Sequence, residues 1–265
     1  MWRTRADAAR PARSVGVDMM LPSDACQGLP LRRGMLFRAG VLSTHDAALI
    51  APARALGIRH VIDFRSVHER DNELCLWGAL LGVRSQRAPV ASDVRASDAA
   101  SDALIAAFIR QPDAGAARTL MRVLYHSFGY AFLPHLRTLL APLALGEPLL
   151  VHCTAGKDRT GFACALIASA AGVPYPQVID NYLTHGQQAA CGPQAARLRQ
   201  MLANYLWSTP DDATLAALSG VDASYLDTAF DVLLTRHGSI EAYLAAGGID
   251  AAMLAKVRTT LVHER

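Results

Sequence analysis

The stretch VHCTAGKDRTG, residues 151–161, contains a cysteine and an arginine separated by five residues. The apolar run at 148–151 that leads into it predicts a short buried strand. The apolar, small-residue run at 162–171 that follows predicts a buried helix. Cys153 to Arg159 should then form a tight turn that directs backbone N–H groups and the positive end of the helix dipole into one concavity. The pattern therefore predicts a site for a tetrahedral anion, with Cys153 at its floor.

The Cys-x5-Arg spacing has a chemical reason. Five residues let the chain loop once around a phosphate, and Arg159 in the first helical turn can hold two oxygens with its planar fork. Cys153, at a helix N-terminus beside cations, is expected to be a thiolate, and Thr160 can donate a hydrogen bond to its sulfur. The alternative, a buried structural cysteine before a surface arginine, does not account for the polar Gly-Lys-Asp-Arg run. The residues expected to bind phosphate are Thr154, Ala155, Gly156, Lys157, Asp158, Arg159 and Thr160.

Bulk composition favours a globular chain. Its 265 residues are 52% hydrophobic and 18% charged, and no linker-like stretch divides them. We therefore expect one domain at 14–265 after a loose, Arg- and Ala-rich tail at 1–13. The net charge of +3 is too small to indicate a nucleic-acid partner, and no apolar run is long enough to predict stable membrane insertion.

Cysteine usage points to a reducing compartment. The count is odd, and the five show no spacing typical of zinc or of a disulfide framework. An apolar stretch of signal-peptide length is also missing from the N-terminus. These features favour the cytoplasm and leave secretion by a route without a signal peptide open. The cysteines are Cys26, Cys75, Cys153, Cys164 and Cys191.

Hydrophobic patterning alternates short apolar runs with helical periods. Strands are predicted at 35–37, 58–65, 83–90 and 148–151, with a surface loop at 92–102. Helices are predicted at 43–56, 103–110, 114–127, 131–143, 162–171, 176–183, around 226–234 and around 253–261, and 186–221 is expected to be irregular. This order predicts an α/β domain with a mainly parallel central sheet flanked by helices and a helical C-terminal part.

Two charged residues follow predicted strands. Asp63 lies near the end of the 58–65 strand, and active sites in open parallel sheets lie beyond the C-terminal strand ends. Asp63 is therefore a candidate for the site, although pairing with Arg65 or another arginine explains it equally well. Arg38 follows the 35–37 strand and is either a surface charge or a supporting residue.

The string HCTAGKDRTG resembles the phosphate-binding loop of cysteine-dependent tyrosine phosphatases, and its Gly-Lys-Asp-Arg variant resembles the atypical bacterial branch. Further matching stretches are LFRAG at 36–40, VIDFR at 61–65 with Glu69, NYL at 181–183 and GSIEAYL at 238–244. One departure is that residues 14–18, SVGVD, match an expected Asn-Phe-Arg-Asp-like segment only in degenerate form. The resemblance implies a tyrosine-phosphatase-like fold and a helical lid within 186–221. The substrates it implies are phosphotyrosine, often phosphoserine and phosphothreonine, and phosphoinositides.

With this resemblance, the loop predicts a phosphomonoesterase that forms a phosphocysteine. Cys153 would attack phosphorus, while Arg159 and the loop amides neutralise the equatorial oxygens, so no metal or other cofactor is required. Lys157 would add a second cation at the pocket. His152, Asp63 and Arg38 are candidates for supporting roles.

The matching residue of the resembling family makes Asp158 the expected general acid. Residues 114–146 contain no Asp or Glu, and Glu147 precedes the strand at its wrong end. Asp63 is the competing candidate. Bracing Lys157 or Arg159 is the other role open to Asp158.

Two other classes of protein remain open. One is a phosphate- or phosphoinositide-binding module with weak or no turnover. The other is a cysteine enzyme for sulfur transfer or arsenate reduction. Such an enzyme would need a different loop or a second thiol that resolves the intermediate, and nothing in the sequence places a second thiol near Cys153.

Overall fold

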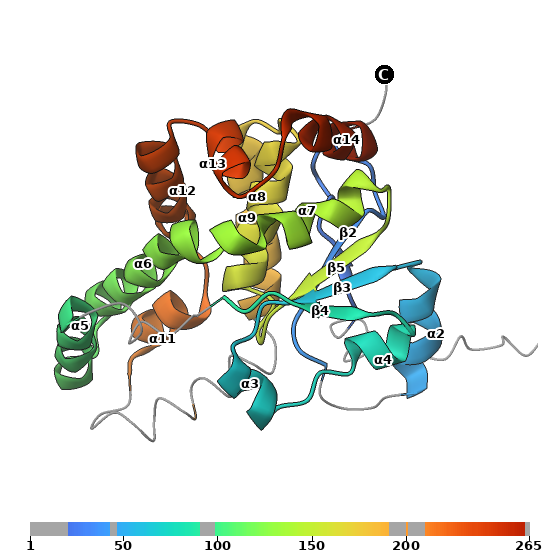
Figure 1. Ribbon diagram of the computed structural model, residues 1–265. Helices are drawn as coiled ribbons and strands as arrows, with labels where there is room; N and C mark the ends of the chain where they lie inside the picture. Colours follow the sequence, from blue (N-terminus) through green and yellow to red (C-terminus); the bar gives the residue numbers. More distant parts are fainter. Residues whose placement is uncertain (1–20, 43–46, 91–98, 191–199, 201–209, 263–265) are drawn as a thin grey trace, which may run out of the picture.

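The computed structural model describes residues 21–42, 47–90, 99–190, 200 and 210–262 (Figure 1). The predicted tail at 1–13, the degenerate motif at 14–18 and most of 191–209 within the predicted lid lie outside these residues. None of the described helices combines the length and apolarity needed to cross a membrane.

The described strands form one sheet in the order β1-β2-β5-β3-β4. β1 pairs antiparallel with β2, and the other pairings are parallel. The predicted mainly parallel α/β sheet is therefore confirmed. The strands are β1 (Ser23–Asp24), β2 (Leu36–Ala39), β3 (His60–Asp63), β4 (Ser85–Arg87) and β5 (Leu149–His152).

The central strand β5 decides where the site lies. All four of its residues are buried, and His152 is in register with Ala39 of β2 and Asp63 of β3. Because the three strands are parallel, their C-terminal ends meet at one edge of the sheet. Cys153 is the first residue beyond that edge.

The sheet separates two apolar cores, because successive strand residues face opposite sides. Leu149 and Val151 join the larger core, and Leu150 joins the smaller. α2 (Ala47–Ala55) and α4 (Trp77–Leu81) cover the smaller core. The larger core lies under α6 (Ala114–Ala131), α7 (Leu136–Ala144), α8 (Asp158–Ala170), α9 (Tyr175–Ala190), α12 (Ala223–His237), α13 (Ile240–Ala246) and α14 (Ala251–Leu261).

α8 is a buried helix of the larger core. Eleven of its thirteen residues are buried, and those after the polar first turn are mostly apolar or small on all sides of the helix. In Figure 1 it stands behind α7, with the other helices of this layer around it. The remaining described elements are α3 (Val67–Asn72), α5 (Ala99–Arg110), the 3-10 helix η2 (Leu133–His135) and α11 (Asp212–Ser219).

Several local predictions were wrong. Within 186–221, which was expected to be irregular, α11 forms at Asp212–Ser219. The 92–102 loop is too long, because α5 already begins at Ala99. The helix predicted at 176–183 runs on to Ala190, since Gly186 permits close packing rather than a break: a Cβ there would lie 2.4 Å from Val221 Cγ1. α3 was not predicted at all, because it buries no residue and has no apolar period to detect.

Candidate active site

The predicted turn between strand and helix is confirmed. β5 ends at His152 and α8 begins at Asp158, so residues 153–157 connect them. Cys153 is only 2% exposed. Thr160, in the first turn of α8, donates a hydrogen bond from Oγ1 to Cys153 Sγ over 3.2 Å. The sulfur therefore lies at a helix N-terminus and already accepts a hydrogen bond.

Gly156 allows the loop to fold this tightly. Its φ is +68°, in the left-handed region that favours glycine. A Cβ at this position would lie 2.5 Å from the carbonyl carbon and oxygen of Ala39, at the end of β2. Both the backbone angle and the space therefore require glycine.

The loop backbone offers hydrogen-bond donors. Within the described residues, the N–H groups of residues 154–159 donate no hydrogen bond to the protein. The first N–H groups of a helix have no partner inside it, and here they continue into the preceding turn. Such a run of free amides at a helix N-terminus suits an anion.

Arg38 orients two of these amides from behind the loop. It lies on β2, is 3% exposed, and its Nη2 donates to the Gly156 carbonyl at 2.7 Å and to the Lys157 carbonyl at 3.5 Å. In a trans peptide the N–H points opposite to the C=O. Holding these two carbonyls toward Arg38 therefore directs the N–H groups of Lys157 and Asp158 away from it.

Arg159 is held by a carboxylate on one edge. Its Nη1 donates to Glu69 Oε2 at 2.7 Å and its Nη2 donates to Glu69 Oε1 at 2.6 Å. Nη1 also approaches the Phe64 carbonyl at 3.3 Å. A guanidinium has five N–H groups, and among the described residues Nε–H and the second Nη2–H have no acceptor. One edge of the fork therefore fixes Arg159 and the other can hold two oxygens of a ligand.

Glu69 is a candidate site residue to which the sequence analysis assigned no role. It lies on α3, where a capping box with Ser66 fixes its carboxylate through a 2.8 Å hydrogen bond from the Ser66 N–H. Thr154 Oγ1 donates to the same carboxylate at 2.5 Å. Burial opposes ionisation of Glu69, but Arg159 outweighs it and lowers the pKa to about 2. The Ser-x-x-Glu pattern at 66–69 was the signal that could have identified it.

Asp63 lies at the expected strand end but is engaged. It is 4% exposed, and the guanidinium of Arg65 contacts both of its carboxylate oxygens, at 3.1 Å for Nε to Oδ1 and 2.9 Å for Nη2 to Oδ2. This is the pairing that the sequence left open as an alternative. Both carboxylate oxygens of Asp63 are therefore occupied by Arg65.

His152 is fully buried between two side chains on the smaller-core side. Its Nε2 lies 3.6 Å from Cys75 Sγ and 3.9 Å from Asp63 Oδ1. Burial lowers the pKa of His152, and the Asp63 carboxylate only partly offsets this. Cys75 packs against the smaller core whereas Cys153 belongs to the larger one, so the sheet lies between their surroundings.

Asp158 is oriented by the helical layer. Tyr125 of α6 donates from its hydroxyl to Asp158 Oδ1 at 3.0 Å, and Lys157 Nζ lies 3.2 Å from the same oxygen. The Asp158 side chain remains 21% exposed. Among the described residues Oδ2 has no partner, so one oxygen is fixed and the other can meet a substrate.

Lys157 does not extend toward the centre of the loop. Its side chain is buried, and Nζ donates to the Leu218 carbonyl at 2.9 Å and to the Gly220 carbonyl at 2.7 Å, at the C-terminal end of α11. Carbonyls at a helix C-terminus lack partners within the helix, so an ammonium is well placed there. Its expected role as a second pocket cation therefore stays a prediction that this geometry does not favour.

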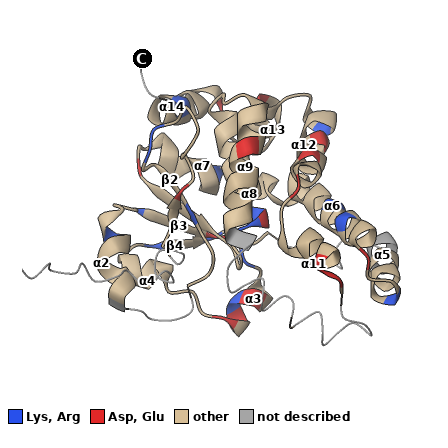
Figure 2. Cartoon of the chain, turned by 180° about the vertical axis from the view of Figure 1, so that it is seen from behind, with Lys and Arg blue, Asp and Glu red and all other residues tan. Residues whose placement is uncertain are grey.

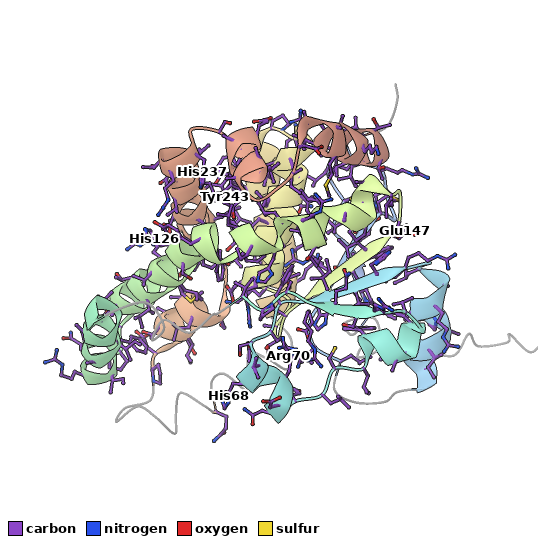
Figure 3. The ribbon with its side chains drawn as sticks, in the orientation of Figure 1. His68, Arg70, His126, Glu147, His237 and Tyr243 are labelled. Carbon is purple, nitrogen blue, oxygen red and sulfur yellow. The ribbon has the colours of Figure 1, made fainter. Side chains whose placement is uncertain are left out.

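The fold thus gathers Cys153, Arg159, Asp158, Arg38 and Glu69 around one turn. Glu147 lies away from this turn, between α7 and β5 (Figure 3). His68 and Arg70 belong to α3, the helix that carries Glu69 (Figure 3). α3 itself carries charges of both signs (Figure 2).

Comparison with known proteins agrees with this geometry. Residues 16–263 match the tyrosine phosphatase family. This chain belongs to that family. It is 30% identical over 273 aligned residues to the triple specificity protein phosphatase PtpB of Mycobacterium tuberculosis, with 88% of this chain and 92% of that protein covered. It is 33% identical over 228 residues to a Cupriavidus necator protein named provisionally as a tyrosine-protein phosphatase, with 86% and 79% covered.

The family resemblance found in the sequence is therefore confirmed, and so is the enzyme class. The chain is a hydrolase of the tyrosine phosphatase family. The roles of individual residues and the identity of the substrate need arguments from the site itself.

Proposed function

We propose that this phosphatase hydrolyses phosphotyrosine, and also phosphoserine, phosphothreonine or phosphoinositides, through a phosphocysteine at Cys153. One observation carries the proposal: a buried sulfur that accepts a hydrogen bond from Thr160 lies in a turn whose amides donate to no group of the described residues. Arg159, in the first turn of the helix that follows, has two N–H groups with no acceptor in the same part of the chain. The proposed nucleophile and the donors proposed for the phosphoryl group thus belong to one short segment.

The first step transfers the phosphoryl group to sulfur. The Cys153 thiolate attacks phosphorus in line, the S–P bond forms and the P–O bond to the leaving group breaks. Arg159 and the loop amides hold the three equatorial oxygens, whose charge persists through a loose transition state. Asp158 donates its proton to the departing oxygen.

The second step returns the enzyme to its starting state. A water molecule attacks phosphorus, the P–S bond breaks, and the Asp158 carboxylate takes the proton that the water loses. The thiolate leaves toward Thr160, whose hydroxyl donates to it. Phosphate is released and Asp158 is again protonated.

The choice of Asp158 over Asp63 rests on their surroundings. Arg65 contacts both oxygens of Asp63, which is almost fully buried, whereas Asp158 is partly exposed and its Oδ2 has no partner among the described residues. A general acid must reach the leaving oxygen directly or through one water. These surroundings favour Asp158 over Asp63 as the acid.

A hydrolysis panel tests the proposal. Phosphotyrosine, phosphoserine and phosphothreonine peptides and phosphoinositides in micelles are compared by phosphate release, with Cys153→Ser as the blank. We expect turnover of phosphotyrosine and of at least one other class, and none by the blank. If phosphate esters bind but no panel member is turned over, the chain is a binding module. Turnover that survives in Cys153→Ser contradicts the phosphocysteine.

A further inference from the structure

Two buried tyrosines form a directed hydrogen-bond chain that ends on Asp158. Tyr125 of α6 and Tyr182 of α9 are 0% and 1% exposed, and their hydroxyl oxygens are 2.7 Å apart. Tyr125 donates to Asp158 Oδ1 at 3.0 Å. A hydroxyl has one proton to donate, so Tyr125 must accept from Tyr182. The chain therefore runs from Tyr182 through Tyr125 to Asp158.

The surroundings of both tyrosines favour their protonated forms. Burial raises the pKa of Tyr125 well above 10, and the Asp158 carboxylate adds to the effect. Burial likewise raises the pKa of Tyr182. The two tyrosines therefore act as hydrogen-bond donors and not as acids, and the donation from Tyr125 to Asp158 sets the direction of the hydrogen-bond chain.

The hydrogen bonds from Tyr182 through Tyr125 to Asp158 determine which oxygen of Asp158 carries the exchangeable proton. Oδ1 accepts from Tyr125 and lies 3.2 Å from the Lys157 ammonium. An oxygen with two donors is a poor place for a third proton, so the proton of the neutral acid lies on Oδ2. The same contacts fix the side-chain rotamer, because Lys157 is itself anchored on α11 and Tyr125 is packed in the core.

We propose that Tyr125 is a positioning residue for the acid step, and that Tyr182 supports it by donating to the Tyr125 hydroxyl. The proposal rests on the proposed function, with Asp158 as general acid. As Oδ2 releases its proton to the leaving oxygen, negative charge develops on the carboxylate and the hydrogen bond at Oδ1 becomes charge-assisted. Such bonds are roughly twice as strong as neutral ones. The hydrogen bond from Tyr125 to Asp158 is therefore stronger in the transition state than in the ground state. Only an interaction of that kind accelerates the chemical step.

The test uses the dependence of kcat/KM on the leaving group, because kcat/KM reports transfer of the phosphoryl group to Cys153 and not the later hydrolysis that all substrates share. Tyr125→Phe removes one hydroxyl and leaves the ring. For a series of aryl phosphates with leaving groups of increasing basicity, we expect a loss of about 10-fold in kcat/KM for the most basic phenols and almost none for the most activated one, in proportion to one charge-assisted hydrogen bond. Tyr182→Phe should show the same trend with a smaller loss, because it acts through Tyr125.

Tyr243→Phe is the matched control. Tyr243 of α13 is also fully buried and packs against His237, but within the described part of the chain its hydroxyl has no hydrogen-bond partner (Figure 3). Its replacement should leave the leaving-group dependence of kcat/KM unchanged. A purely structural role for Tyr125 would lower kcat/KM equally for all members of the series, and that result overturns the proposal.

Asp158→Asn in the same series separates this proposal from the proposed function. We expect Tyr125→Phe to cause no further loss in the Asp158→Asn background, because its effect passes through the carboxyl. If Asp158→Asn changes the leaving-group dependence and Tyr125→Phe does not, the positioning role is wrong and the phosphatase mechanism stands. If neither Asp158→Asn nor Tyr125→Phe changes the leaving-group dependence while Cys153→Ser is inactive, the assignment of Asp158 as acid and the positioning role of Tyr125 both fail. The proposed phosphocysteine at Cys153 then still stands.

Discussion

The turn between β5 and α8 is held from two sides by different kinds of interaction. On one side α3, a six-residue helix with no buried residue, fixes Arg159 through a single carboxylate, Glu69. On the other side α6 and α9, long helices of the larger core, fix Asp158 through the hydroxyls of Tyr125 and Tyr182.

This difference has a physical consequence. Nearly all the stabilisation that α3 gives the site comes from ionised groups, so it depends on pH and on the charge of one side chain. The helical layer contributes two buried tyrosine hydroxyls, whose pKa values are raised by burial, so these donors are less sensitive to pH than the Glu69 carboxylate. Arg159, the proposed ligand of the phosphoryl oxygens, is therefore held by the more easily disturbed of the two contacts.

Gly156→Ala should disturb both sides at once. The substitution forces an alanine into φ +68° and into contact with Ala39 backbone atoms at 2.5 Å. We expect activity to fall below detection and the melting temperature to drop. Gly146→Ala is the control, since it has a similar φ of +76° but nothing within 4 Å of its Cβ. It should cost only about 1–2 kcal/mol of backbone strain and leave kcat unchanged. Equal effects of the two variants would show that the contact with Ala39 is unimportant.

Arg159→Lys should impair only the α3 side. Lysine keeps the charge but cannot hold Glu69 with one edge and substrate oxygens with the other. We expect kcat to fall by at least about 10²-fold, in line with removal of one transition-state donor. Steady-state kinetics with an activated aryl phosphate measures it, and Arg258→Lys on α14, whose partner Glu241 is exposed, serves as control. A variant within a few-fold of the parent enzyme would place Arg159 away from the phosphoryl group.

Glu69→Gln should have a smaller effect on the same side. The amide can still meet Arg159, but it loses its charge and one acceptor. We expect kcat to fall by about 10-fold, the scale of one charge-assisted hydrogen bond. Glu241→Gln removes an exposed ion pair with Arg258 and should change kcat and stability very little. If the two variants behave alike, Glu69 does not position Arg159.

Acid should weaken the structure in two stages. Burial, reinforced by Arg38, lowers the pKa of His185 from 6.5 to about 4, so the folded state binds this proton less readily than the unfolded one. Its contribution is complete above pH 6.5 and is lost as the pH falls toward 4. Glu69, with a pKa lowered from 4.5 to about 2, contributes fully above pH 4.5 and loses its contribution as the pH falls toward 2. Chemical unfolding across this range should show that Glu69→Gln reduces the lower stage and leaves the upper stage unchanged, while Asp211, Asp222 and Glu241, whose pKa values are also lowered by their partners, keep part of the lower stage. A lower stage of unchanged size in that variant would contradict the assignment.

Sequence reasoning found the turn because its chemistry is local. Five residues between Cys153 and Arg159, a glycine and two flanking apolar runs are enough to define a strand, an anion loop and a buried helix. Asp158 could be proposed for the same reason, since it lies inside the loop. The mainly parallel sheet followed from the alternation of apolar runs and helical periods.

The supporting residues could not be found in this way. Tyr125 and Tyr182 are ordinary core positions on amphipathic helices, and nothing in their spacing shows that their hydroxyls meet. Lys157 looked like a pocket cation because its neighbours are loop residues, but the carbonyls that receive its ammonium come from α11, about sixty residues further along the chain. Such partners are set by tertiary packing and not by local pattern.

The most direct test is to trap the phosphocysteine. The enzyme is mixed with an activated aryl phosphate, quenched in acid within one turnover, digested and examined by mass spectrometry. The phosphoryl group should be found on the peptide that contains Cys153. More should accumulate in Asp158→Asn, because an activated substrate still phosphorylates that variant while its hydrolysis lacks the base, and none should form in Cys153→Ser. Continued turnover with no phosphoryl group on Cys153 in either the parent enzyme or Asp158→Asn would contradict the mechanism.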